Sequence, residues 1–172
     1  GENLDESWLT GTGNYFMKGR DWERELHMEY YNATHEKEFA QQVGARVHGN
    51  TSRYHPQKTV RLYARGDYGQ THFEYPFFEG KEIEEFKRIL LRNSSADFGG
   101  TMFKDILCSE LITEMDMDYM ASQVCVVYIN GEYWGVHSIR ERIDEHFLSD
   151  NHGVDPDSLD LLTLNAVVEE GD

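Results

Sequence analysis

Alternating apolar and polar residues predict that most of this chain is β-sheet. The alternation is typical of strands that bury one face, and each such segment is bounded by turn-forming residues. Strands are expected at 22–31, 41–48, 58–64, 87–91, 124–129, 133–139 and 160–164. Asn130-Gly131 falls between two of these segments and is a strong signal for a tight hairpin. An aromatic-rich segment, 73–78, follows a turn at 66–69.

Two helices are predicted among these strands. Over 102–115 the apolar residues recur every three or four positions, which is the period of an amphipathic helix. Ser95 or Asp97 is expected to cap its start. A short helix is predicted over 144–150, with Gly153 as the residue that ends it. Mostly antiparallel sheet with one main helix predicts an α+β fold.

Composition predicts an acidic globular chain. The 172 residues carry a formal net charge of −16, which argues against nucleic-acid binding because a duplex binder needs a broad basic face. No apolar run approaches the roughly 20 residues of a membrane span, and no signal peptide is recognised. Residues 1–20 are expected to form an irregular lead-in and 21–172 one domain. Cys108 and Cys125 lie in apolar contexts and are expected to be buried free thiols.

One segment of this acidic chain is purely cationic. Residues 39–66 contain no Asp or Glu, although the average composition would place about five there. The segment carries Arg46, His48, Arg53, His55, Lys58, Arg61 and Arg65. Local positive potential attracts phosphate or carboxylate groups even when the whole protein is acidic. The segment is therefore predicted to contain an anion site.

The loop 49–58 is the best candidate for that anion site. Its glycine and short hydroxyl residues stand at a strand end, where backbone N–H groups can turn toward an anion. Arg53 offers a planar fork for phosphate and Lys58 a point charge. The spacing of a Walker A loop is absent. The alternative, which stays open, is a solvated hairpin whose cations pair with acids elsewhere in the chain.

The helix 102–115 also carries a candidate acid. Glu110 could face the sheet as a carboxylate partner for a strand lysine. The alternative is a boundary residue of an amphipathic helix, and spacing alone favours it.

Four stretches, in order along the chain, resemble the CotH family of spore-coat and secreted kinase-like proteins. They are VHGNTSR (47–53), PQKTVRLY (56–63), LLRN (90–93) and VYINGEYWGV (127–136), the last followed by RER (140–142). The resemblance spans roughly residues 40–150, with a weaker match over 14–31. It implies the N-terminal part of an atypical protein-kinase-like fold, with phosphoryl transfer from ATP to Ser or Thr of a protein in the presence of Mg²⁺ or Mn²⁺.

The resemblance also implies roles for individual residues. Lys58 would be the catalytic lysine that contacts the ATP phosphates, and Arg53 a phosphate neighbour. Asn50 and Ser52 belong to the same turn and would bind the nucleotide with them. Glu141 lies near the place where a kinase hinge would pass the adenine.

Other parts of a kinase are expected beyond this chain. The metal-binding and catalytic carboxylates of kinase-type folds lie in the C-terminal lobe, so metal ligands are expected downstream of Asp172. The chain would then be the nucleotide-phosphate half of the domain, inactive alone, with ATP and a protein substrate as partners. The resemblance also implies a secreted or cell-surface location in a bacterium. The alternative functions are a non-catalytic CotH-like surface or structural module, or a glycan-binding module that uses Arg53 and Lys58.

Overall fold

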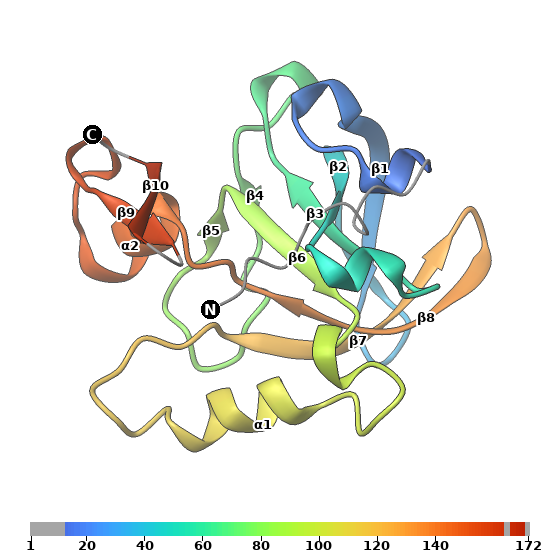
Figure 1. Ribbon diagram of the computed structural model, residues 1–172. Helices are drawn as coiled ribbons and strands as arrows, with labels where there is room; N and C mark the ends of the chain where they lie inside the picture. Colours follow the sequence, from blue (N-terminus) through green and yellow to red (C-terminus); the bar gives the residue numbers. More distant parts are fainter. Residues whose placement is uncertain (1–12, 164–165, 171–172) are drawn as a thin grey trace, which may run out of the picture.

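The structure, a computed structural model, describes residues 13–163 and 166–170 (Figure 1). Its centre is a six-stranded antiparallel sheet that curls into a half-barrel, with the strand order β1-β2-β3-β6-β8-β7. These strands are β1 (Arg24–Tyr31), β2 (Lys37–His48), β3 (Thr59–Tyr63), β6 (Arg88–Arg92), β7 (Ser122–Ile129) and β8 (Glu132–Arg140). The predicted α+β class is confirmed, and every predicted strand in this sheet is present with its ends shifted by a few residues.

Smaller elements surround the sheet. Two-stranded pairs are formed by β4 (Phe73–Glu74) with β5 (Glu85–Phe86) and by β9 (Leu161–Thr163) with β10 (Val167–Glu170). The α-helices are α1 (Lys104–Leu111) and α2 (Glu145–His152), and short 3-10 helices include η2 (Asn14–Phe16), η3 (Arg20–Trp22), η4 (Thr51–Tyr54), η5 (Gly66–Tyr68), η6 (Ser95–Asp97) and η7 (Pro156–Ser158). The alternation of residues did not predict β10. Most of the expected lead-in, 1–12, lies outside the described residues.

One face of the sheet buries an aromatic core. The sheet contributes aliphatic residues from neighbouring strands to this core, and the segment that carries β4 and β5 covers them with phenylalanines. Residues at most 6% exposed in this core are Val43, Leu62, Ala64, Phe73, Phe77, Phe78, Phe86, Ile89 and Ile139. The ring centroids of Phe78 and Phe86 lie 5.3 Å apart at nearly right angles, which is a favourable edge-to-face geometry. The aromatic segment noted in the sequence therefore packs over the core and shields it from solvent.

Helix α2 begins and ends as the sequence predicts. The Asp144 carboxylate accepts hydrogen bonds from the backbone N–H groups of His146 and Phe147, both at 3.1 Å. Gly153, with φ of 67°, ends the helix in the left-handed conformation that glycine adopts without strain. The same Asp144 carboxylate forms an ion pair with Arg88 of β6 at 3.0 Å. One side chain therefore both caps α2 and attaches it to the sheet.

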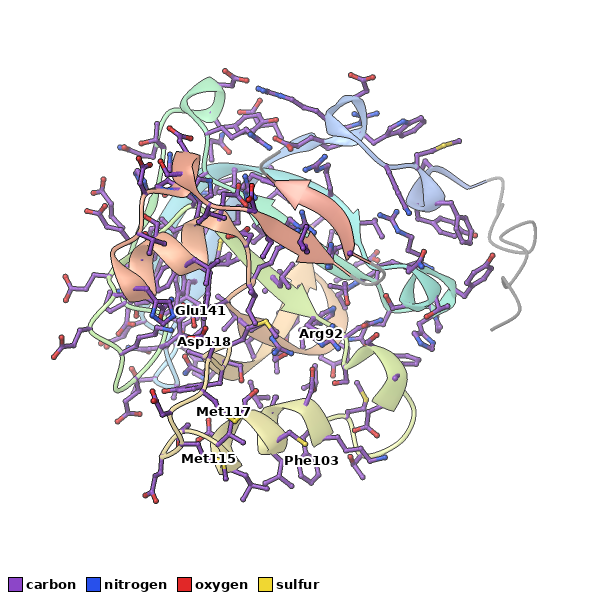
Figure 2. The ribbon with its side chains drawn as sticks, turned by 60° about the vertical axis from the view of Figure 1, so that its left-hand side comes forward. Arg92, Phe103, Met115, Met117, Asp118 and Glu141 are labelled. Carbon is purple, nitrogen blue, oxygen red and sulfur yellow. The ribbon has the colours of Figure 1, made fainter. Side chains whose placement is uncertain are left out.

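Helix α1 is shorter than predicted, and none of its residues is buried. The side chains of its apolar stripe are exposed by 49% at Phe103, 45% at Leu107 and 68% at Leu111. Phe103 and Met115 lie on the side of the molecule that α1 forms (Figure 2). These three side chains therefore do not pack on the sheet, whereas Ile106 and Ile112 of the same stripe are half-buried. Cys108 is also exposed, so the prediction of a buried thiol is wrong at this position.

Asp97 caps α1 from a position outside the helix. Its Oδ2 accepts hydrogen bonds from the N–H groups of Phe103 at 3.1 Å and Lys104 at 3.2 Å, and from the Thr101 hydroxyl at 2.6 Å. These hydrogen bonds lower the pKa of Asp97 to about 2, the Thr101 hydroxyl having the largest effect. Of the two expected caps, Ser95 and Asp97, the structure shows Asp97 in this role, although the residue at the N-cap position is Phe103.

We expect Asp144→Ala to lower the free energy of unfolding by about 2–4 kcal/mol, because it removes both a helix cap and a buried ion-pair partner. Asp144→Asn is the matched control, since asparagine caps a helix as well as aspartate but carries no charge. Urea unfolding should rank the wild type above Asp144→Asn and Asp144→Asn above Asp144→Ala. Equal losses in the two variants would contradict a contribution from the cap.

Candidate functional site

The face of the sheet opposite the aromatic core carries arginines. Side chains alternate along a strand, so strands that send aliphatic residues to the core send the residues between them to the other face. We call this the arginine face and define it by Arg46 of β2, Arg61 of β3, Arg88 and Arg92 of β6, and Arg140 of β8. The register places Arg46 directly opposite Arg61, and Leu90 between Arg61 and Arg140. Three of the arginines therefore lie in one row across the sheet.

Carboxylates from peripheral elements neutralise four of these arginines. Glu23, Asp105 and Asp144 come from the segment before β1, from α1 and from the cap of α2. The N–O distances are 3.4 Å for Arg46–Glu23, 2.6 Å for Arg92–Asp105, 2.6 Å for Arg140–Asp105 and 3.0 Å for Arg88–Asp144. Together these four pairs attach three outer segments to the same face of the sheet.

Glu23 reaches the sheet because of a glycine. Its side chain is 1% exposed and also pairs with Arg65 at 2.8 Å and accepts a hydrogen bond from Tyr68 at 3.0 Å. A Cβ atom at Gly44 would collide with the Glu23 carboxylate and the Tyr68 ring. Glycine at position 44 therefore leaves the space in which this carboxylate is buried.

Arg61 lies at the centre of the arginine face and differs from its neighbours. It donates to His48 Nδ1 at 2.5 Å and to the Tyr63 hydroxyl at 3.1 Å, and within the described residues it has no carboxylate partner. Its Nε is buried and, like the Nε of Arg140 in the same row, has no hydrogen-bond partner there. Burial lowers the pKa of Arg61, and the positive charge of Arg142 lowers it further.

The Tyr63 ring gathers three guanidinium groups. Arg46 lies 4.3 Å, Arg65 4.6 Å and Arg61 5.8 Å from the ring centroid. A tyrosine ring attracts cations to its face, and its hydroxyl accepts from Arg46 and Arg61. Tyr63 therefore holds like-charged groups close together.

The structure places Arg53 of the predicted anion loop inward. Its side chain donates to the carbonyl oxygens of Gly49 at 2.5 Å, Tyr15 at 2.6 Å, Val47 at 2.8 Å and Met17 at 3.1 Å. Arg53 is 6% exposed. Its fork of N–H donors thus fastens the lead-in segment and the loop to the end of β2.

Lys58 also points at the backbone. Its Nζ donates to the carbonyl oxygens of Arg53 at 2.6 Å and His55 at 2.5 Å, and it lies 4.2 Å from the centroid of the Tyr15 ring. Burial lowers the pKa of Lys58. Within the described residues neither Lys58 nor Arg53 contacts a carboxylate, so the alternative of a hairpin whose cations pair with acids does not describe these two.

The other predicted nucleotide residues fall in two places. Ser52 is 4% exposed and lies in η4, while Asn50 precedes that turn and is exposed. Glu141 follows β8, where its carboxylate pairs with Lys81 at 2.5 Å and accepts from the Ala121 N–H at 2.9 Å. The strand register aligns Lys58 with the level of His137, four residues before Glu141, which corresponds to about 13 Å along the sheet. The structure therefore brings Asn50, Ser52 and Lys58 together but not Glu141.

Sequence reasoning missed the carboxylates of this site. Glu110, the candidate partner for a strand lysine, is exposed on α1. Asp105, one turn earlier, pairs with two strand arginines instead. Its position at the N-terminal end of a predicted helix after a strand that ends in arginine was the available signal.

The described residues contain no group of three or more His, Cys, Asp or Glu side chains arranged to hold a metal ion. No helix in this part of the chain is long and apolar enough to cross a bilayer.

A comparison with protein families now places the chain. The family model described as CotH kinase protein matches residues 45–170. The chain belongs to the CotH kinase family. No curated protein matches the chain. The CotH region contains the loop 49–58, both α-helices and the whole arginine face, whereas Glu23 lies before it.

In this CotH domain we expect Arg53→Lys to lower the free energy of unfolding by about 2–4 kcal/mol. Lysine cannot span four carbonyl oxygens, and each buried acceptor left unpaired costs about 1–3 kcal/mol. Arg20→Lys is the control, because Arg20 forms an exposed pair with Asp67 and such pairs contribute little. Urea unfolding tests both variants, and equal stability of the two would contradict the structural role of Arg53.

We also expect His48 to make the CotH domain less stable in acid. Burial, followed by the charge of Arg61, lowers the pKa of His48 to about 3, against about 6.5 when unfolded. Between these values the unfolded chain binds more protons, so stability falls as the pH falls, by up to about 1.4 kcal/mol per pH unit. His48→Gln keeps an acceptor for Arg61 and removes the titration. Urea unfolding at pH 7, 5.5 and 4.5 should show a steeper loss for the wild type, and parallel losses would contradict the prediction.

Proposed function

We propose that this CotH domain binds the phosphates of ATP and takes part in phosphoryl transfer to Ser or Thr of a secreted or cell-surface protein. Membership of the CotH kinase family supports a kinase-like function. The observation that most strongly supports nucleotide binding is the ion pair between Arg92 and Asp105, at 2.6 Å.

This ion pair has the arrangement that protein kinases use. In kinases a lysine on a strand pairs with a glutamate on the helix that follows, and the lysine contacts the ATP phosphates. Here Arg92 ends β6, α1 follows with Asp105, and β8 of the next hairpin returns beside β6. Arginine and aspartate in place of lysine and glutamate conserve the charges, and arginine can bind a carboxylate and a phosphate at the same time through its five donors.

We propose that the loop 49–58 supports the same phosphates. The Lys58 ammonium has three N–H donors and uses two on carbonyl oxygens, which leaves one for a phosphate oxygen. Asn50 and Ser52 would bind through the turn that they form with Arg53. Arg53 would act by holding this turn, since its donors are occupied. Glu141 would fix the end of β8 beside the adenine.

The phosphoryl transfer proposed here also requires a divalent metal ion. Mg²⁺ and Mn²⁺ need several oxygen ligands, and the described residues offer no group of three carboxylates or histidines. We therefore assign no metal ligand here and propose that residues outside the described part hold the ion. That ion would neutralise the developing charge on the transferred phosphoryl group.

A non-catalytic CotH module is the second candidate. It is favoured by the inward position of Arg53 and Lys58, whose donors serve the fold of the loop in the absence of a ligand. Such a module would present the surface of the loop 49–58 to a structural partner or an anionic glycan without binding nucleotide.

A thermal-shift titration with ATP and Mn²⁺ tests the first candidate. Ligand bound to the native state at 100 times Kd adds about 2.7 kcal/mol, which raises Tm by about 5–10 °C for a chain of this size. We expect Lys58→Ala to lose most of this rise. Lys37→Ala is the control, because it removes one surface lysine from the far end of β2, where Lys37 pairs with Glu29. Equal shifts in the wild type and Lys58→Ala would contradict the role of Lys58, and no shift in any protein would favour the non-catalytic module.

A further inference from the structure

We propose that Arg61 and Arg46 form a binding site for a phosphate-type oxyanion on the arginine face. The site uses side chains of β2 and β3 rather than the loop 49–58, because the alternation along β3 sends Arg61 to the face opposite Leu62 of the core. It goes beyond the proposed function, since it needs neither the adenine nor the transfer reaction. A free phosphate, a pyrophosphate or the phosphates of a nucleotide share the chemistry that it recognises.

The first observation is a pairing that a sheet normally avoids. Arg46 and Arg61 are direct cross-strand partners of β2 and β3, and like charges at such positions destabilise a sheet. Glu23 compensates Arg46 at 3.4 Å, but within the described residues no carboxylate compensates Arg61. A costly local arrangement of this kind is expected where it serves a ligand.

The second observation is the unsatisfied donor of Arg61. Its side chain is half-buried, and its Nε has no partner within the part of the chain that the structure describes. A buried cation without a counter-charge and a buried donor without an acceptor both cost free energy. An oxyanion beside Arg61 would supply the charge and the acceptor together, through a charge-assisted hydrogen bond.

The third observation is that the two guanidinium groups are already held near each other. Both lie against the Tyr63 ring, at 4.3 Å and 5.8 Å from its centroid. His48 accepts a hydrogen bond from Arg61 at 2.5 Å and so fixes its plane from the other side. Two planar forks on adjacent strands suit a tetrahedral anion with several oxygens better than a single carboxylate.

The surrounding charges favour an anion at this place. Positive charge reaches the site from β2, β3, β6, the loop 49–58 and the segment after β8, through Arg46, Arg61, Arg92, Arg53 and Arg142. His48 is neutral because burial lowers its pKa to about 3. Carboxylates balance part of this charge, since Glu23 pairs with Arg46, Asp105 with Arg92 and Asp144 with Arg142, but within the described residues none pairs with Arg61.

Calorimetric titration with inorganic pyrophosphate tests the site, using the wild type, Arg61→Gln and the control Arg20→Gln. We expect Arg61→Gln to lose at least tenfold in affinity and the control, which removes an exposed arginine, to keep the wild-type affinity. We also expect Arg61→Gln to unfold at the same or a higher temperature without ligand, because it removes an uncompensated charge. Wild-type affinity in Arg61→Gln would overturn the proposal, as would an absence of pyrophosphate binding to the wild type.

A second measurement needs no variant. The Nε–H resonance of Arg61 in ¹⁵N-labelled wild-type protein reports directly on the unpartnered donor. Pyrophosphate should shift this resonance in a saturable way, and a titration that leaves it in place would overturn the proposal even if Arg61→Gln fails to fold.

The same titrations with ATP separate this inference from the kinase proposal. If pyrophosphate binding needs Arg61 and ATP does not bind, the oxyanion site is supported and the proposal of nucleotide binding is contradicted. ATP binding that needs Lys58 and is unchanged in Arg61→Gln would support nucleotide binding through the loop 49–58, and pyrophosphate affinity that is also unchanged in Arg61→Gln would overturn the site proposed here.

Discussion

Ion pairs between the arginine face and carboxylates from outside the sheet hold this molecule together at its periphery. Glu23, Asp105 and Asp144 each carry a separate outer segment to the sheet: the segment before β1, helix α1 and helix α2. The aromatic core on the other face stabilises the sheet itself. Because the carboxylates are largely buried, removal of one partner would leave a charge without compensation, which is far more costly than the loss of a surface pair.

The same ion pairs connect the fold to the candidate chemistry. A CotH domain that handles phosphate needs positive charge, yet uncompensated arginines on a half-buried face would destabilise the sheet. Carboxylates neutralise most of the row and leave Arg61 without one in the described residues. In the loop 49–58, carbonyl oxygens stabilise the partly buried cations instead. They accept hydrogen bonds from Arg53 and Lys58 without cancelling the charge of these side chains. Positive potential is therefore kept at two separate places.

Local patterns in the sequence predicted the strands, the Asn130-Gly131 hairpin, the capping by Asp97 and the end of α2 at Gly153, because each depends on neighbours along the chain. They did not predict where the cations of 39–66 would point. Arg53 and Arg61 look alike in sequence, but Arg53 fastens a loop through contacts with residues 15 and 17, and Arg61 faces residues on neighbouring strands. Asp105 and Glu23 were missed for the same reason, since strand order decides which arginines they meet.

The way in which α1 is attached determines which part of the domain opens first by local unfolding. The helix buries no side chain and is tied to the sheet by one carboxylate, so it has little of the apolar burial that makes a segment unfold together with the core. Its backbone amides should exchange with solvent through local opening, long before the strands beneath it open. Because Asp105 is partly buried, salt screens its pairs with Arg92 and Arg140 less than it screens surface pairs, so replacement of Asp105 rather than added salt would release α1. We therefore expect α1 to open locally while the strands beneath it stay folded.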